Sequence, residues 1–297
     1  MKVVIIGASI AGHTVATSLR QLHNDCSITL VTQSPYPAYD KRRLLDYLTG
    51  SVKEKDLFLV QPDFYQQRNI NFLKECKVVT VAPVRKQLSY KNKTDRRESL
   101  EYDILVVCSG TKTVLPEVDG INKEGVYTLD SLVDFKAFRS HLLTDPVCIM
   151  GSGESAFSLA GALAAKQREV KVISAALPAV NTCPAAVETI AAEVVELIGE
   201  GGIQAIRLRE GKIIGTSLPV FMPEPKEASI DFLKDMDIEL DGSRIAVDEN
   251  MRTSSANIYA SGAVCVSKGI PSKDKSWDDV INESKILAEH LVHAIGG

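Results

Sequence analysis

Short apolar runs alternate with longer amphipathic stretches along most of the chain. Residues 3–6 form an apolar run that predicts a buried strand, and the stretch after it predicts a helix that ends near residue 22. A second apolar run, over residues 27–32, predicts the next strand. Together they form a strand, helix, strand unit of about 30 residues, in which the two strands are expected to be parallel.

The same alternation predicts a second unit of this kind in the middle of the chain. It begins at residue 147, continues through a helical run at 157–165 and reaches its second strand at 170–174. A loose Ala- and Pro-rich segment, residues 175–190, stands where a full crossover helix is expected. The other predicted elements are short strands over 71–90, a buried strand at 102–108, strands and turns over 203–209 and 212–222, and helices at 41–49, 131–143 and 277–294. Residues 245–263 are expected to close the fold. This order indicates an α/β fold with parallel sheets.

Each unit carries a glycine-rich turn between its first strand and its helix. The turns read GASIAG over residues 7–12 and GSGESA over residues 151–156. One glycine accepts the tight bend, and another lets backbone amides approach a pyrophosphate at the positive end of the helix dipole. A lone glycine triplet is often an ordinary turn, but a strand before it and a helix after it make the motif more specific. Two copies predict two dinucleotides held face to face, which hydride transfer from nicotinamide to flavin requires.

The two turns are not equally complete. In the first, Gly7 and Gly12 hold the outer positions, and Ser9 places a side chain where the phosphate is expected. In the second, Gly151 and Gly153 are present and an alanine takes the third position, which the motif tolerates. The other cofactor-binding residues predicted in the turns are Ile10, Ala11, Glu154 and Ser155.

The strand that follows each turn ends without the carboxylate that usually holds the adenosine ribose. Thr32 and Gln33 end the first of these strands, and Ser174 and Ala175 end the second. Because neutral groups stand at both ends, we expect weaker ribose contacts at both sites.

Composition excludes several classes of function. The chain has 297 residues, 45% of them hydrophobic and 24% charged, which is typical of globular proteins and long enough for two domains. A net charge of −4 and the absence of a basic stripe argue against nucleic-acid binding. No apolar run approaches the roughly 18 residues of a membrane span, and the first residues form a strand rather than a signal peptide. We therefore expect a cytoplasmic protein.

Cysteines and histidines form no recognisable site in the sequence. The six cysteines include no CxxC pair, and the five histidines are scattered. This spacing predicts no metal site and no catalytic nucleophile. A basic cluster, Lys41, Arg42 and Arg43, follows a Pro-rich turn. A solvated helix face and a phosphate contact explain this cluster equally well.

Several segments, taken in order, resemble the FAD-dependent pyridine-nucleotide oxidoreductases, in particular the flavin part of NADH-dependent nitrite reductases, rubredoxin reductases and NADH oxidases. The segments are GASIAG, YDKRRLLDYLTG (39–50), VVCSGTKTVLP (106–116), GVYTLDSLVD (125–134) followed by GSGESA, VDENMRTSSANIYASGA (247–263) and a closing helix with Trp277. The resemblance implies two Rossmann-like domains, the second inserted in the first. It places an FAD domain at residues 1–116 plus 241–297 and a shortened NAD(P)-binding domain at 117–240, and it leads us to expect that the family's third, dimer-forming domain is absent.

The resemblance also assigns residues to the cofactors. It adds to the FAD site Gln33, Lys41, Arg42, Val78, Ser109, Gly110, Gly262, Ala263 and Trp277. Three of the family's FAD contacts are altered: an aspartate falls on Ala263, a glutamate near Gln33 and a glycine on Ser9. The family's glutamate near the nicotinamide falls on Ser158. A hydrogen bond to a charged group contributes about 1.5–3 kcal/mol, so the loss of one such contact is expected to lower the affinity for a cofactor tenfold or more.

The resemblance implies an FAD-dependent NAD(P)H oxidoreductase that passes electrons to a redox partner protein or a small acceptor, without a redox disulfide. The cofactors would carry the chemistry, so no catalytic side chain is expected. Two alternatives stay open. One is an electron-transfer subunit of a larger complex that keeps FAD but has a degenerate NAD site, and the other is a non-catalytic nucleotide-binding scaffold.

Overall fold

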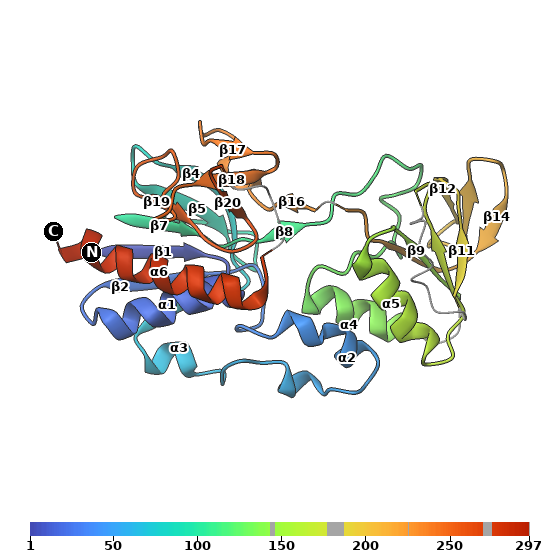
Figure 1. Ribbon diagram of the computed structural model, residues 1–297, viewed down its shortest axis with the longest axis horizontal. Helices are drawn as coiled ribbons and strands as arrows, with labels where there is room; N and C mark the ends of the chain where they lie inside the picture. The colour runs from blue at the N-terminus through green and yellow to red at the C-terminus, as the bar shows by residue number, and fades with distance from the viewer. Residues whose placement is uncertain (143–145, 177–186, 225, 270–274, 297) are drawn as a thin grey trace. The chain divides into compact units, whose positions relative to one another are not determined.

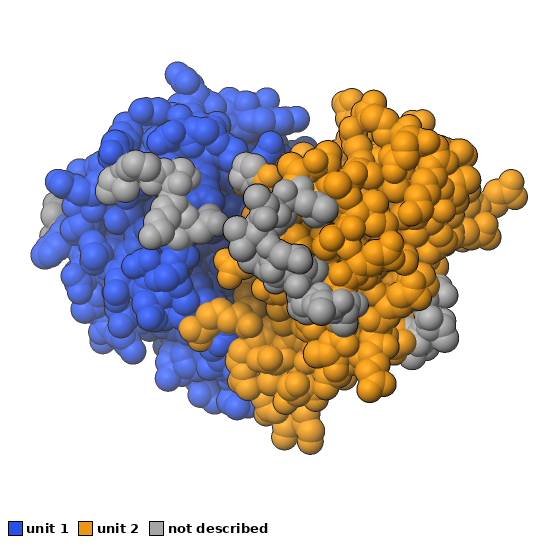
Figure 2. Space-filling view, turned by 45° about the vertical axis from the view of Figure 1, so that its right-hand side comes forward, with its two compact units in different colours: residues 1–40, 58–111, 227–297 blue, residues 41–57, 112–226 orange. Residues whose placement is uncertain are grey.

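The computed structural model describes residues 1–142, 146–176, 187–224, 226–269 and 275–296. Two compact units make up the chain (Figure 2). Unit 1 contains Met1–Asp40, Phe58–Thr111 and Glu227–Gly297, and unit 2 contains Lys41–Leu57 and Lys112–Lys226. Among the described helices, none combines the length and apolar character needed to cross a membrane.

A five-stranded parallel sheet forms the centre of unit 1 (Figure 1). Its order is β19 (Ile258–Ala260), β7 (Ile104–Val107), β1 (Lys2–Ile6), β2 (Ser27–Val31) and β3 (Ile70–Leu73). The inner strands are buried on both faces and consist almost wholly of Val, Ile and Leu, as parallel strands covered on both sides do. The alternation of apolar runs in the sequence predicted this sheet.

Two helices lie side by side along one face of this sheet (Figure 1). These are α1 (Ile10–Leu22) and α6 (Trp277–Gly296). In α1 the residues Ala11, Val15 and Leu19 recur at helical spacing and are buried. In α6 the buried positions include Leu287 and Leu291. These apolar stripes join the strands in one hydrophobic core.

An antiparallel sheet completes the core of unit 1. Its strands are β4 (Lys77–Ala82), β5 (Gln87–Lys91) and β6 (Arg97–Glu101), and their buried side chains join the same core. The smaller elements of this unit are α3 (Phe64–Gln67), η3 (Asp231–Leu233), β17 (Leu240–Asp241), β18 (Arg244–Val247) and β20 (Cys265–Ser267), with β18 and β20 paired in parallel. The short strands β8 (Thr111–Lys112) and β16 (Glu227–Ala228) pair with each other.

Unit 2 repeats the strand, turn, helix, strand arrangement. Its parallel sheet has the order β11 (Glu188–Ile190), β10 (Val170–Ile173), β9 (Val147–Met150) and β15 (Leu218–Phe221), and α5 (Glu154–Ala164) joins β9 to β10. A three-stranded antiparallel sheet follows, made of β12 (Val194–Ile198), β13 (Ala205–Leu208) and β14 (Ile213–Gly215). The other elements are η1 (Lys41–Arg43), α2 (Leu44–Leu48), η2 (Glu54–Asp56) and α4 (Leu132–His141).

The segment 41–57 belongs to unit 2 because it packs on α4. The Arg139 guanidinium lies 4.6 Å from the centre of the Tyr47 ring, and Lys136 forms an ion pair of 2.9 Å with Glu54. In this segment the helix predicted at 41–49 is replaced by one 3-10 turn, η1, and the five residues of α2.

The structure changes the sequence-based elements in a few places. The predicted strand at 212–222 is two strands, β14 and β15, and the helix predicted from residue 157 begins at Glu154. The strand β6 and the helix α3 were not predicted, because exposed polar residues interrupt their patterns, and the strand β12 was not predicted either. Of the loose segment predicted at 175–190, residues 177–186 lie outside the described residues, and its end forms β11.

Candidate cofactor site

The carboxyl ends of the central strands of unit 1 meet at one edge of the sheet. There the amide of Gly7 donates to the carbonyl of Val31 at 2.7 Å, and the amide of Cys108 donates to the carbonyl of Ile6 at 2.8 Å. The chain builds outward from β1 through β2 and β3, and then returns to β7 on the other side of β1. A reversal of this kind opens a crevice between neighbouring strands, and this is where open α/β sheets bind ligands.

The first glycine-rich turn fits tightly against the strand beside it. Gly7 has φ +105°, and a Cβ atom placed there would lie 2.2 Å from the carbonyl oxygen of Cys108. A Cβ on Gly12 would lie 1.8 Å from the carbonyl oxygen of Gly7. Ser9 is the N-cap of α1, but its side chain makes no capping hydrogen bond. The amides of the first helical turn are therefore not capped by Ser9, which is what an anion site at this helix end needs.

Ser109 supplies a polar group that lacks a partner within the described residues. Its hydroxyl oxygen is buried and makes no hydrogen bond there. It follows β7 directly, and its backbone nitrogen lies 3.1 Å from the Cβ position of Gly7. Gly110 follows at φ +69°, and its carbonyl accepts the amide of Ser229 at 2.9 Å. A buried hydroxyl without a partner is unfavourable unless a ligand satisfies it, so this residue fits a bound cofactor.

A third motif reaches the same edge from the far end of the sequence. Ser261 follows β19, and its amide donates to the carbonyl of Val107 at 3.0 Å. Gly262 has φ +89°, and a Cβ there would lie 2.9 Å from the Cβ of Ala11 in α1. Ala263 is exposed. The residues of GASIAG, CSG and SGA are thus brought together, although the last is about 250 residues from the first.

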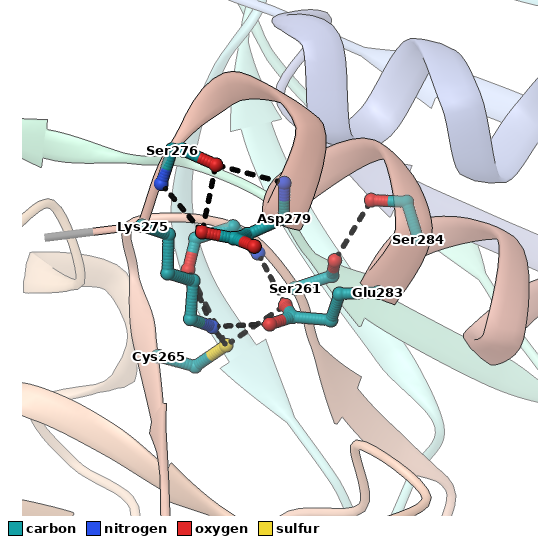
Figure 3. A network of polar contacts seen from close by, with 8 residues as sticks. Ser261, Cys265, Lys275, Ser276, Asp279, Glu283 and Ser284 are labelled. Atoms are coloured by element: carbon teal, nitrogen blue, oxygen red, sulfur yellow. Dashed lines mark hydrogen bonds and ion pairs between the residues drawn. The ribbon is translucent and has the colours of Figure 1, made fainter. Parts of the chain in front are cut away.

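Side chains from α6 and the segment before it hold the Gly262 turn (Figure 3). Glu283 accepts the amide of Gly262 at 2.8 Å, and Lys275 donates to its carbonyl at 3.2 Å. Lys275 and Glu283 form an ion pair of 2.5 Å, with side chains only 15% and 11% exposed. The thiol of Cys265 lies 3.4 Å from the Lys275 ammonium, and burial, together with the Glu283 charge, raises the pKa of this thiol to about 12. The thiol is therefore protonated and serves as a packing group rather than a nucleophile.

The start of α6 has a polar cap of its own. The side chain of Asp279 accepts the amide and hydroxyl of Ser276 at 3.0 and 2.7 Å, and the Ser276 hydroxyl accepts the amide of Asp279 at 3.1 Å. Trp277, predicted at the flavin, is the first residue of this helix and is half-buried. The cap and the acidic first turn already neutralise part of the dipole of this helix.

The residues that directly follow β2, Thr32 and Gln33, are neutral. Gln33 is exposed, and Thr32 accepts the amide of Cys76 at 2.9 Å through its carbonyl. That bond places the start of β4 beside the end of β2. Val78, two residues further on, is buried in the core. The predicted adenosine side of the crevice therefore has no carboxylate from β2.

The basic residues predicted at the cofactor, Lys41 and Arg42, lie in unit 2. The ammonium of Lys41 donates to the carbonyl of Asp130 at 3.3 Å, and the carboxylate of Asp130 pairs with Lys226 at 2.5 Å. Thr113 donates to the same carboxylate through its amide and its hydroxyl, each at 2.9 Å. Phosphate contact by Lys41 or Arg42 stays a prediction.

The second glycine-rich turn has the same backbone plan. The amide of Gly151 donates to the carbonyl of Ile173 at 3.2 Å, and a Cβ on Gly151 would lie 2.4 Å from the carbonyl oxygen of Met222. Glu154 and Ser155 are exposed in the first turn of α5. At Gly153 the surroundings differ, because a Cβ there would lie 2.1 Å from the carboxylate of Glu224. Ser158 is exposed on α5.

Two groups of residues in and near these turns were not found by sequence reasoning. Glu283 carries a signal that could have revealed it, because it lies on the apolar stripe of α6 beside the buried residues Val280 and Leu287, where a carboxylate needs a partner. Glu224 and Lys275 carry none, since their contacts depend on loops from distant parts of the chain.

Metal and disulfide chemistry find no support among the described residues. Within the described ranges, no group of three or more His, Cys, Asp or Glu side chains could hold a metal ion. Five cysteines in these ranges are free, and all five are buried. Cys183, the sixth, lies outside the described residues.

Comparison with known proteins places the chain in a family. Residues 1–283 match the model of the pyridine nucleotide-disulphide oxidoreductases. The chain is 25% identical over 285 residues to an NADH oxidase of Methanocaldococcus jannaschii, covering 88% of this chain and 62% of the relative. It is 26% identical over 317 residues to the rubredoxin-NAD(+) reductase of Pseudomonas putida, covering 98% of this chain and 80% of that protein.

Solved structures agree with this fold. The crystal structure of the covalent putidaredoxin reductase–putidaredoxin complex is similar with a TM-score of 0.86 and 21% identity, covering 98% of this chain and 75% of that one. The water-forming NADH oxidase from Lactobacillus brevis, bound to NADH, gives a TM-score of 0.87 and 19% identity, covering 98% and 69%. Both likenesses support the predicted α/β fold with Rossmann-type domains.

The chain spans 62% of the length of the Methanocaldococcus protein. The family is nevertheless shown by the match over nearly all of this sequence. Oxidoreductases of this family use FAD and NAD(P)H, the two cofactors that the sequence predicted. The chain belongs to the pyridine nucleotide-disulphide oxidoreductase family.

Proposed function

We propose that this chain is an FAD-dependent NAD(P)H oxidoreductase that passes electrons to a protein or small-molecule acceptor without a redox disulfide. FAD is assigned to unit 1. The observation that carries this assignment is the meeting of Gly7, Ser109 and Gly262 at the carboxyl edge of one parallel sheet. These residues come from three distant motifs, and the buried hydroxyl of Ser109 has no partner among the described residues.

The residues of unit 1 have distinct tasks in this proposal. The amides at the start of α1 would bind the pyrophosphate, helped by the Ser9 hydroxyl that makes no capping bond. The Ser109 hydroxyl would hydrogen-bond the cofactor where it crosses β7. Lys275 and Glu283 act on the protein itself, since they fix both the amide and the carbonyl of Gly262. When bound, FAD supplies the chemistry, accepting a hydride and releasing electrons to an acceptor.

The absence of a disulfide in this proposal rests on the thiols near the edge of the sheet. Cys108 and Cys265 are both free and buried, and burial raises the pKa of each. A thiol that stays protonated does not attack a disulfide or a flavin. Electrons would therefore leave directly, and relatives named as rubredoxin reductase and as NADH oxidase make both a protein and oxygen reasonable acceptors for this chain.

One observation favours a second candidate. The Glu224 carboxylate lies against Gly153 in the second turn, where the pyrophosphate of a nicotinamide nucleotide is expected. A chain that binds FAD but is not reduced by NAD(P)H would be an electron-transfer subunit that obtains its electrons from a partner protein.

A visible spectrum tests these proposals together. We expect the purified protein to be yellow, and anaerobic NADH or NADPH to bleach the flavin band. Bleaching by dithionite but by neither nucleotide would select the electron-transfer subunit instead. A colourless protein that takes up no added FAD would refute the flavin assignment. Gly12→Val is the matched negative control, because its side chain has no space against the Gly7 carbonyl.

A further inference from the structure

An acidic side chain occupies the approach to the second glycine-rich turn. Glu224 is the third residue after β15, at the carboxyl edge of the sheet of unit 2. A Cβ placed on Gly153 would lie 2.1 Å from both Cδ and Oε2 of Glu224, and 2.3 Å from Oε1. All three atoms of the carboxylate therefore occupy the space that a side chain at position 153 would fill.

That surface is the one on which a dinucleotide depends. Gly153 is the N-cap of α5, an 11-residue helix whose first amides point toward the turn. The glycine at this place in the motif lets a pyrophosphate approach the backbone, and the helix end favours negative charge. The carboxylate of Glu224 approaches the backbone at Gly153 as a pyrophosphate would, and it carries the negative charge that the helix end favours. It is an anion of similar oxygen chemistry that lies beside the same helix end.

No described residue neutralises Glu224. It forms no ion pair and no hydrogen bond with any residue in the described part of the chain. The first turn of α5 adds a second carboxylate, that of Glu154, and no basic residue. A diphosphate arriving at this turn would meet two negative side chains, one of which fills the space it needs. Like charges at contact distance oppose binding even in water.

We propose that the Glu224 carboxylate is an internal competitor of the nicotinamide nucleotide's pyrophosphate. The nucleotide binds only when this side chain has moved away from Gly153, so Glu224 lowers the affinity of unit 2 for any ligand with a diphosphate. This inference rests on the proposed function, which assigns the nucleotide to unit 2. Parts of the nucleotide that carry no phosphate are unaffected by Glu224.

Binding of ADP-ribose and of adenosine to the full chain tests this competition. Glu224→Gln keeps the shape and removes the charge, whereas Glu224→Ala also clears the space. We expect both variants to bind ADP-ribose about tenfold more tightly than the wild type, about 1.4 kcal/mol. Their affinity for adenosine should be unchanged. Glu210→Gln is the matched control, since Glu210 is an exposed glutamate of the same unit, and it should behave as the wild type.

A further variant locates the effect. Gly153→Ala in the Glu224→Ala background refills the cleared space, and we expect it to reverse the gain in ADP-ribose affinity. The proposal is overturned if Glu224→Ala binds ADP-ribose no better than the wild type, or if neither binds it. It is also overturned if Glu210→Gln gains as much, because the effect would then be one of net charge.

The outcome is separable from that of the proposed function. ADP-ribose affinity is read without flavin, while the flavin assignment is read from colour. A colourless protein in which Glu224→Ala still gains ADP-ribose affinity would refute the flavin enzyme and support the internal competitor. A yellow protein whose ADP-ribose affinity does not respond to Glu224 would do the reverse.

Discussion

The tight fit of Gly7 against β7 gives a prediction whose magnitude follows from the structure. In Gly7→Ala the new methyl group would lie 2.2 Å from the carbonyl oxygen of Cys108, so β1 and β7 must separate by about 1 Å to reach ordinary contact. Overpacking of this kind costs about 1–3 kcal/mol. The φ of +105° adds the cost of a positive φ, about 1–2 kcal/mol. We therefore expect Gly7→Ala to lower the free energy of unfolding by about 2–5 kcal/mol.

Gly242→Ala separates the two costs. Gly242 also has a positive φ, +60°, but a Cβ there meets nothing within 4 Å, so only the conformational cost of about 1–2 kcal/mol applies. It lies in the turn between β17 and β18, in the same unit and away from the glycine-rich turn. The difference between the two variants isolates the contact with Cys108.

Tryptophan fluorescence provides the assay. Trp277 is the sole tryptophan of the chain and lies in unit 1, so its emission during urea unfolding reports that unit alone. We expect the midpoint for Gly7→Ala to lie well below that for Gly242→Ala, and flavin absorbance to be lost only from the former. Equal midpoints together with retained flavin in Gly7→Ala would refute the close-packed turn as the flavin site.

Three further predictions concern side chains of unit 1. Burial, and then the Arg68 charge, lower the pKa of His13 from 6.5 to about 4, so the folded state binds fewer protons between these values. Because of His13, the free energy of unfolding should fall by about 2 kcal/mol between pH 8 and pH 5. In urea titrations of His13→Asn this part of the pH dependence should be missing. Lys275→Met leaves the buried Glu283 without its ion-pair partner and should lower the free energy of unfolding by about 3–5 kcal/mol. The double variant Lys275→Met with Glu283→Gln should regain most of this stability in the same urea titration, and additive losses in the two single variants and the double variant would contradict this pairing. Ser109→Ala removes a hydroxyl with no described partner, so the free energy of unfolding, measured by urea titration, should stay within about 0.5 kcal/mol of wild type while flavin affinity, measured by titration, falls severalfold; an unchanged affinity would count against this contact.

Much of the architecture could be predicted because it rests on local patterns. The runs that form β1, β2 and β7 are almost wholly apolar, and a buried parallel strand requires this of its sequence. The turns at Gly7 and Gly151 were recognisable because their glycines are needed by backbone contacts, which leave few alternatives. Strand β6 was missed because every second residue is exposed and charged or polar.

The polar environment of the turns could not be predicted in the same way. The loss of an aspartate at Ala263 is visible in the sequence, but the Lys275 and Glu283 pair that holds the neighbouring Gly262 is not. Likewise the sequence gives no distance between Gly153 and Glu224, which are 71 positions apart and meet only when β15 pairs beside β9. Such contacts depend on strand order, which a single sequence specifies weakly.

The assembly of unit 1 from three separate stretches has a consequence for synthesis on the ribosome. Strand β19 and helix α6 complete the sheet and cover α1, but they are made only after the whole of residues 112–226. Until then α6 does not yet cover the apolar stripe of α1. The edge of β7 that later pairs with β19 also has no partner strand. Long-range pairings of this kind form slowly, and until they form they leave hydrophobic surface exposed to aggregation. We therefore expect the nascent chain to need protection from aggregation until β19 and α6 have been made.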